Sequence, residues 1–197
     1  MAISSILQRG ALLHRLPRPL WQAALLLLTA TSSCGQAATN DSPTSPQPFT
    51  VHEVTQFSSP WAMDFLPGSG VPLTKMALVS EREGLLWLVD TATGRREAVI
   101  GVPEVNVAGQ GGLGDVVVHP GFAGNQRVYL SFVEKGDGGS GAVLGYGRLI
   151  LGSGPPRIDG FKIIWRQAPK VSGNGHFSHR IAFGPDGLLY LTSGDRQ

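Results

Sequence analysis

A glycine-rich loop, a histidine and two strand-like segments follow one another from Val171 to Gln197, V-S-G-N-G-H-F-S-H-R-I-A-F-G-P-D-G-L-L-Y-L-T-S-G-D-R-Q. Arg180–Phe183 alternates in polarity and Leu188–Thr192 is apolar, so each is typical of a β-strand. Between them, Gly184–Gly187 has the composition of a turn. The stretch therefore predicts a loop, a strand, a turn and a second strand, with His176 at the point where the loop meets the first strand.

His176 is the best catalytic candidate in this stretch. Imidazole titrates near neutrality, so a histidine presented by a loop can take a proton from a substrate hydroxyl at physiological pH. The alternative is a histidine that bonds only to loop backbone. Arg180 carries a fixed positive charge that suits an anionic cofactor, or equally a salt bridge at the rim of a site.

His176 and His179 also form an H-x-x-H pair, a spacing found in zinc sites. Zinc-binding pairs usually lie on a helix or are accompanied by further ligands, and this loop has neither feature. The sequence therefore predicts no metal site within the chain.

The rest of the chain from Phe49 onward lacks any long stretch with helical periodicity. Instead it has short apolar runs bounded by Gly, Pro, Asp and Asn, which are typical of strands. These further runs are Trp61–Leu66, Lys75–Ser80, Leu85–Val89, Asp115–His119, Arg127–Val133, Ala142–Leu151 and Phe161–Arg166. The composition and pattern predict an all-β protein.

Three segments share one order of features: the end of a strand, a proline turn, and an apolar strand that ends in Ser or Thr. They lie at 65–80, 118–131 and 183–192, and their prolines are 53 and 65 residues apart. A β-rich repeat of about 50 residues is typical of a β-propeller, which usually closes with four to eight blades. At this spacing 49–197 holds about three blades, so we expect the N-terminal portion of a longer protein.

The first 48 residues have a different composition from the rest. Residues 1–37 combine three arginines, the apolar run Leu20–Ala30 and small residues, the layout of a secretory signal, and the run is too short to span a bilayer. Cys34 offers the alternative of a lipoprotein signal with a lipid anchor, although Thr31 stands where such signals usually have Leu. Residues 38–48 are polar and proline-rich, which predicts a disordered linker. We expect a secreted, periplasmic protein.

Net charge gives no sign of a nucleic-acid partner. The chain carries 16 basic and 14 acidic residues, but three of the basic ones and none of the acidic ones fall in the first 38 residues. The remainder therefore has 13 basic and 14 acidic residues and a net charge of −1, which gives no indication of a nucleic-acid surface.

The loop before Asp115 contains a formal G-x-G-x-x-G at Gly109, Gly111 and Gly114. In a dinucleotide site this pattern opens a helix, whereas here the following residues predict a strand, so a nucleotide site is not expected. Gln110 is the one long polar side chain of the loop. Its amide can donate to and accept from a hydroxylated ligand, or it can tie the loop to backbone.

Eight motifs in the same order make this sequence resemble a known family, the soluble periplasmic PQQ-dependent sugar dehydrogenases, or glucose/sorbosone dehydrogenases. The resemblance covers about residues 50–197. The motifs are Pro60–Met63, Ser80–Gly84, Val102–Val105, Gly109–Leu113, His119–Phe122, Gly175–Arg180, Gly184–Gly187 and Gly194–Arg196.

The resemblance implies the first half of a six-bladed β-propeller that oxidises the C1 hydroxyl of an aldose to a lactone. In the family a histidine takes the proton, hydride passes to pyrroloquinoline quinone (PQQ), and a bound calcium ion polarises the cofactor. An external electron acceptor completes the cycle. His176 matches the family's base, and Gln110 matches a glutamine that contacts the sugar. The family's PQQ and calcium ligands lie mainly in later blades, beyond Gln197, so the fragment by itself is expected to be inactive.

Three positions depart from the family pattern. Ser178 stands where Gly usually follows H-F, Gly114 replaces an apolar residue, and Gly175 precedes His176 where the glucose enzymes carry an acid. The last difference favours the broader aldose branch. The first leaves open a propeller that binds a sugar or a protein without redox chemistry, and a calcium-dependent hydrolase on the same architecture is a third, weaker alternative.

Overall fold

The computed structural model describes residues 49–68 and 75–196. The expected signal peptide at 1–37, with its alternative lipid anchor at Cys34, and the expected linker at 38–48 lie outside the described residues. The folded unit spans Thr50–Gln197. Within the described residues, no helix is long and apolar enough to cross a membrane.

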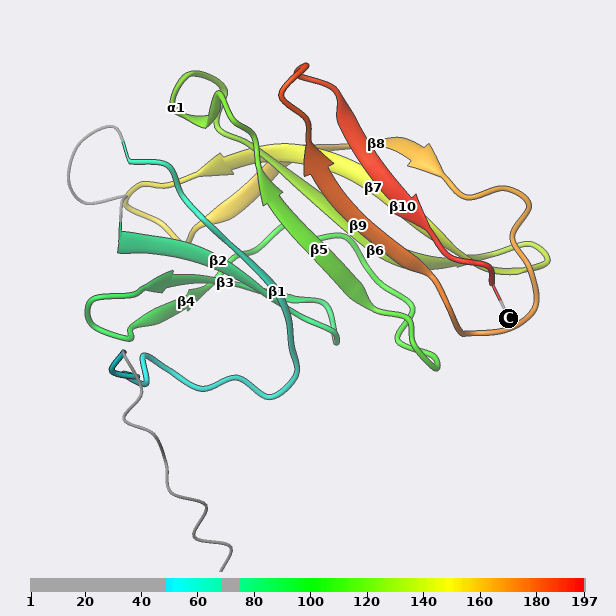
Figure 1. The fold of residues 1–197 in the computed structure, drawn as a ribbon, viewed down its shortest axis with the longest axis horizontal. Helices are drawn as coiled ribbons and strands as arrows, with labels where there is room; N and C mark the ends of the chain where they lie inside the picture. The colour runs from blue at the N-terminus through cyan, green and yellow to red at the C-terminus, as the bar shows by residue number, and fades with distance from the viewer. Residues whose placement is uncertain (1–48, 69–74, 197) are drawn as a thin grey trace, which may run out of the picture. The chain divides into compact units, whose positions relative to one another are not determined.

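The folded unit consists of three antiparallel sheets that follow one another along the chain (Figure 1). The first sheet has the order β1-β2-β3-β4, with β1 Pro60–Phe65, β2 Met76–Glu81, β3 Leu85–Asp90 and β4 Arg96–Ala98. The second has the order β5-β6-β7-β8, with β5 Leu113–Val118, β6 Arg127–Gly136, β7 Gly139–Ile150 and β8 Arg157–Arg166. The third is the pair β9 Ser178–Phe183 and β10 Leu189–Ser193. Two four-stranded blades and the first two strands of a third confirm the all-β propeller architecture.

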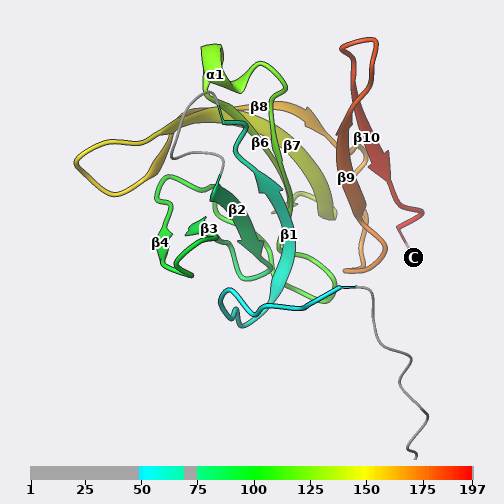
Figure 2. The same cartoon turned by 60° about the vertical axis from the view of Figure 1, so that its left-hand side comes forward.

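The first strands of the three sheets lie side by side in chain order. β5 contacts both β1 and β9, and Figure 1 shows the three strands following one another across the unit. Figure 2 shows the same unit turned by 60°, with the β9–β10 hairpin at the right. The first two sheets enclose one apolar core, which includes Leu78, Leu113 and Phe132. A smaller cluster of Tyr129, Leu144 and Ile181 joins the second and third sheets.

All nine expected strands are present, and the structure adds two elements. β4 is a three-residue edge strand whose residues are all exposed, so it carries no apolar pattern that the sequence could reveal. α1, Phe122–Asn125, is a single helical turn after the His119–Gly121 turn. β8 also begins at Arg157, earlier than expected. The sequence pattern misses its first residues because Gly160, with φ +60°, interrupts the strand where its pairing with β7 is irregular.

A buried serine hydroxyl connects each complete blade to the next; Ser80 and Ser131 are here called the interblade hydroxyls. Ser80 on β2 accepts the Ala62 N–H (3.1 Å) and donates to the Gly114 carbonyl of β5 (2.6 Å). Ser131 on β6 accepts the Asp115 N–H (2.9 Å) and donates to the His179 carbonyl of β9 (2.7 Å). These serines end the repeated apolar strand of the sequence, so the repeat places a hydroxyl at each junction between blades.

Candidate active site

The loops that precede β5 and β9 are far apart in sequence but are hydrogen-bonded to each other. The Gln110 N–H donates to the Asn174 carbonyl (2.7 Å), and the Gln110 Oε1 accepts the His176 N–H (2.7 Å). The two candidate side chains therefore line one open cavity of ≈ 710 Å³. Its lining residues are Trp61, Gln110, His176, Phe177, Ser178, His179, Gly194 and Asp195.

His176 is paired with a carboxylate. Its Nδ1 lies 2.7 Å from the Asp195 Oδ1, and both side chains are about half exposed. A carboxylate only accepts hydrogen bonds, so Nδ1 carries the proton and Nε2 of a neutral ring is left with a lone pair. The pair therefore presents a proton acceptor of fixed orientation at the cavity.

The backbone around His176 has an unusual conformation. His176, Ser178 and His179 have φ values of +49°, +61° and +55°, a region in which residues other than glycine cost on the order of 1–3 kcal/mol each. Gly194 follows β10 and packs directly against this segment, and a Cβ at that position would overlap the His176 carbonyl oxygen. The left-handed φ of Ser178 also explains why the family pattern has glycine there.

Arg196 holds this strained segment in place. Its guanidinium donates to the carbonyls of Gly175 (2.6 Å) and Ser140 (2.9 Å), and it lies 3.6 Å from the centre of the Phe177 ring. Desolvation of the guanidinium lowers the pKa of Arg196. Arg196 thus contacts the residues on both sides of His176. Its guanidinium stabilises the loop and is not part of the cavity lining.

His179 is almost fully buried, with 3% of its surface exposed. Its Nδ1 lies 2.8 Å from the interblade hydroxyl of Ser131. Burial lowers the pKa of His179 to about 4, so this ring is neutral at physiological pH. The two histidines of the H-x-x-H pair consequently have different environments, one facing Asp195 and the other facing Ser131.

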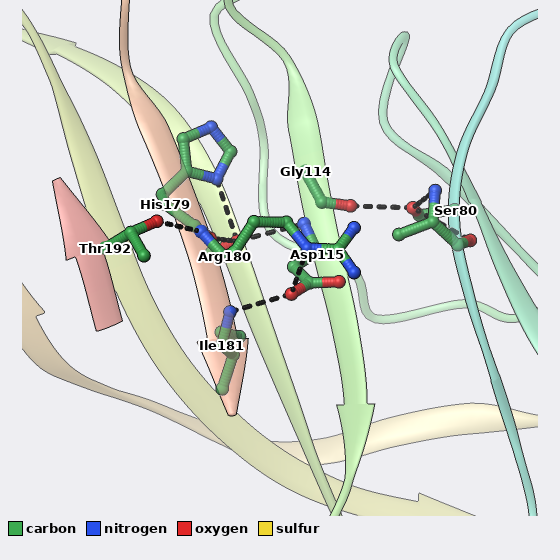
Figure 3. Close-up of polar contacts among 9 residues, drawn as sticks. Ser80, Gly114, Asp115, His179, Arg180, Ile181 and Thr192 are labelled. Carbon is green, nitrogen blue, oxygen red and sulfur yellow. Dashed lines mark hydrogen bonds and ion pairs between the residues drawn. The ribbon is translucent and has the colours of Figure 1, made fainter. Parts of the chain in front are cut away.

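Arg180 is directed away from His176. Its Nε lies 3.3 Å from the Oδ2 of the buried Asp115, and the same oxygen accepts the Ile181 N–H (2.7 Å), as Figure 3 shows. Burial raises the pKa of Asp115, while the hydrogen bond from Ile181 and the charge of Arg180 act in the opposite direction. Arg180 lines a separate cavity beside Trp61, so the structure brings together Gln110 and His176 but not Arg180.

The sheets and the cavity together define the class: a β-propeller with a histidine–aspartate pair between the start of β9 and the end of β10. Residues 57–197 match the family model described as "Glucose / Sorbosone dehydrogenase". This chain belongs to the glucose/sorbosone dehydrogenase family.

Individual relatives agree with this membership. The chain is 38% identical over 137 residues to the aldose sugar dehydrogenase YliI of Escherichia coli, a match that covers 69% of this chain and 35% of that protein. A crystal structure of a glucose dehydrogenase superposes with a TM-score of 0.62 at 41% identity, covering 70% of this chain and 38% of that one. The PQQ-bound aldose sugar dehydrogenase of Streptomyces coelicolor has a TM-score of 0.58 at 32% identity, covering 72% and 40% of the two chains. The chain thus spans little more than a third of the length of these relatives.

The described residues fit the substrate side of such a site better than the cofactor side. PQQ carries several carboxylates, which proteins usually bind with Arg or Lys. The cavity lining includes neither residue among the described part of the chain, and Arg180 and Arg196 bind other partners. Likewise, the described residues include no cluster of three or more His, Cys, Asp or Glu that could hold a metal ion.

Proposed function

We propose that the full-length protein oxidises the C1 hydroxyl of an aldose to the lactone, with PQQ as the two-electron acceptor. Family membership supports sugar dehydrogenation, and one relative is a PQQ-bound aldose sugar dehydrogenase. Within this chain, the supporting observation is the 2.7 Å contact between His176 Nδ1 and Asp195 Oδ1. A ring held in this way offers Nε2 as an acceptor for the hydroxyl proton.

Three residues have separate roles in this proposal. His176 Nε2 takes the proton of the C1 hydroxyl, and Asp195 stabilises the imidazolium that results. Gln110 uses its Oε1 to fix the His176 backbone, which leaves its Nε2 amide to donate to a sugar oxygen. PQQ, when bound, would supply the two-electron acceptor that takes the hydride from C1.

Cofactor binding and cellular location belong to the same proposal. We assign the PQQ and calcium ligands mainly to parts of the protein other than the described residues. Arg180 would join the PQQ ligands by exchanging Asp115 for a cofactor carboxylate. The protein is proposed to act in the periplasm after removal of residues 1–37 or, alternatively, with a lipid anchor at Cys34. An external acceptor would reoxidise the cofactor.

The test is dye reduction by the full-length protein with added PQQ, calcium and glucose, comparing wild type with His176→Ala. Removing a general base typically lowers the rate by 10²–10⁴-fold. His52→Ala is the control, since His52 is exposed and lies outside the cavity. Equal rates in wild type and His176→Ala would exclude His176 as the base.

A propeller that binds a sugar without redox chemistry is the second candidate. Ser178 motivates it, because this residue places a side chain in the cavity wall at φ +61° where the family pattern has glycine. Equilibrium binding separates the two: retained glucose binding without PQQ uptake by the full-length protein would favour the binding module.

A further inference from the structure

Gly114 and His179 occupy equivalent positions in consecutive blades and touch each other. The carbonyl of each accepts from an interblade hydroxyl, Ser80 in one case and Ser131 in the other. The His179 ring fills the space beside Gly114, where a Cβ would overlap ring atoms. The glycine at 114, one of the departures from the family pattern, is therefore what makes room for this imidazole.

The imidazole is not needed for the junction in which it lies. At the preceding junction Ser80 makes the same two backbone contacts, to Ala62 N–H and Gly114 carbonyl, beside a residue with no side chain. The ring of His179 is thus an addition to a connection that is complete without it. It lies at the wall of the cavity that His176 lines.

The hydrogen bonds around Ser131 fix the tautomer of His179. A hydroxyl has one proton. The Ser131 Oγ and the His179 carbonyl oxygen lie 2.7 Å apart, and a carbonyl carries no proton, so the Ser131 proton must lie between these two oxygens. Ser131 Oγ must then accept from His179 Nδ1, so Nδ1 carries the hydrogen and Nε2 carries a lone pair. Figure 3 shows the second ring nitrogen on the side of the ring away from this cluster, toward the start of β9.

Nε2 is an acceptor that stays neutral. It has no hydrogen-bond partner among the described residues, and it is not one of their buried unpartnered side-chain atoms, so it is open to the cavity that His179 lines. Burial keeps the ring unprotonated well below neutral pH. A neutral acceptor in a cavity wall suits a hydroxyl donor and disfavours a carboxylate or a carbonyl, which bring only lone pairs.

We propose that His179 Nε2 accepts a hydrogen bond from a non-reacting hydroxyl of the sugar in the His176 cavity and so contributes to substrate specificity. This proposal deepens the proposed function and relies on it for the identity of the ligand. The role is distinct from that of His176: His179 orients the ring of the substrate and moves no proton.

Two substitutions separate the nitrogens of His179 in the full-length protein. His179→Asn places an amide donor near the Nδ1 position, so it keeps the contact with Ser131 and loses the Nε2 acceptor. His179→Gln reaches the Nε2 position with an amide and loses the contact with Ser131. If the proposal holds, His179→Asn raises KM for glucose roughly three- to tenfold with kcat nearly unchanged, as expected for one lost hydrogen bond. His179→Gln should retain more of the affinity.

A series of glucose derivatives that each lack one hydroxyl identifies the donor. One of these deoxy sugars should bind wild type three- to tenfold more weakly than glucose, and His179→Asn should bind that derivative and glucose equally. A uniform response to every derivative in both proteins would overturn the proposal.

Imidazole nitrogen NMR of the full-length protein provides a readout that does not depend on activity. At pH 7 the His179 Nε2 should be unprotonated, and its resonance should shift when glucose is added. A protonated Nε2, or an unprotonated Nε2 that does not respond to glucose, would overturn the proposal. A glucose-dependent shift without dye reduction would support the role of His179 in sugar binding and contradict the proposed oxidation. Failure of the His179 proposal and failure of the proposed function are therefore distinguishable.

Discussion

At the scale of single residues, the two histidines of the cavity show how environment assigns different chemistry to the same side chain. His176 is about half exposed and faces a carboxylate, so a proton taken by its ring is stabilised. His179 is buried against a serine, so protonation of its ring would place an uncompensated charge in the interior. The first environment suits proton transfer, and the second suits a fixed hydrogen bond.

Replacing Asp195 with Asn tests the orientation of His176. The Asn amide would favour the tautomer with hydrogen on Nε2 and would not stabilise the imidazolium, so we expect kcat of the full-length protein to fall by roughly 10- to 100-fold with little change in KM. Buried pairs of this kind show larger losses, but this pair is exposed to solvent. Asp137→Asn, in an exposed turn, is the control. An unchanged kcat in Asp195→Asn would mean that the carboxylate does not act on the ring.

His179 also makes stability depend on pH. Its pKa in the folded state is about 4, against 6.5 in the unfolded chain, so the unfolded state binds a proton first as the pH falls. The contribution of His179 to the free energy of unfolding is therefore largest above pH 6.5, and it falls by about 2 kcal/mol by pH 5. Denaturant unfolding of the full-length protein at pH 7, 6 and 5 measures this slope.

His179→Asn is the control for that measurement, since it removes the titrating group and should flatten the slope. The raised pKa of Asp115 acts in the opposite direction as the pH falls, but Asp115 is present in both proteins, so the difference between their slopes isolates His179. Equal slopes in the two proteins would show that His179 titrates normally in the folded state.

At the scale of elements, a single irregularity in the hairpin of β9 and β10 sets His176 opposite Asp195. Leu189 pairs with Phe183, and continuing that register would set Arg196 opposite His176. The register shifts between Leu191 and Ser193, so that Ser193 pairs with Ser178, and the same register carried two residues further sets Asp195 opposite His176. The sequence predicts both strands and the turn, but a one-residue shift of register follows from side-chain packing that the strand pattern does not encode.

The interblade hydroxyls are expected to contribute measurably to stability. Ser131→Ala leaves the Asp115 N–H, the His179 carbonyl and His179 Nδ1 without their buried partner, and should destabilise the full-length protein by about 1–3 kcal/mol. Ser80→Ala removes two such contacts and should cost no more than Ser131→Ala. Ser153→Ala in an exposed loop should change stability by less than about 0.5 kcal/mol. Equal denaturation midpoints in all three variants would contradict a stabilising role for these hydroxyls.

At the scale of the whole folded unit, the sequence predicts the blades because each repeats a proline turn and an apolar strand. It does not predict how the blades are joined. The carboxylates that join them, Asp64 to the Val118 N–H and Asp115 to the Ile181 N–H, both at 2.7 Å, bridge 54 and 66 residues of sequence. Such contacts depend on the placement of one sheet against the next. For the same reason, the sequence leaves open whether Arg180 meets an anionic cofactor or a carboxylate of the chain, and the structure pairs it with Asp115.

These junctions predict that the blades open together. The amides of Val118 and Ile181 donate across blade boundaries, so their hydrogen exchange should require the same free energy as the amides of Val128 and Leu130 inside the second blade. Native-state exchange of the full-length protein at increasing denaturant measures the four values. Exchange of Val118 and Ile181 at a clearly lower free energy would show that the blades separate without unfolding.

The junctions between blades also have a direction: in both, a hydroxyl of the earlier blade donates to a carbonyl at the start of the later one. A donor and an acceptor arranged in this way cannot be exchanged. A blade packed in the reverse orientation would set hydroxyl against hydroxyl, or carbonyl against carbonyl. The serine at the end of each repeated strand therefore fixes the order in which one blade faces the next, from hydroxyl to carbonyl.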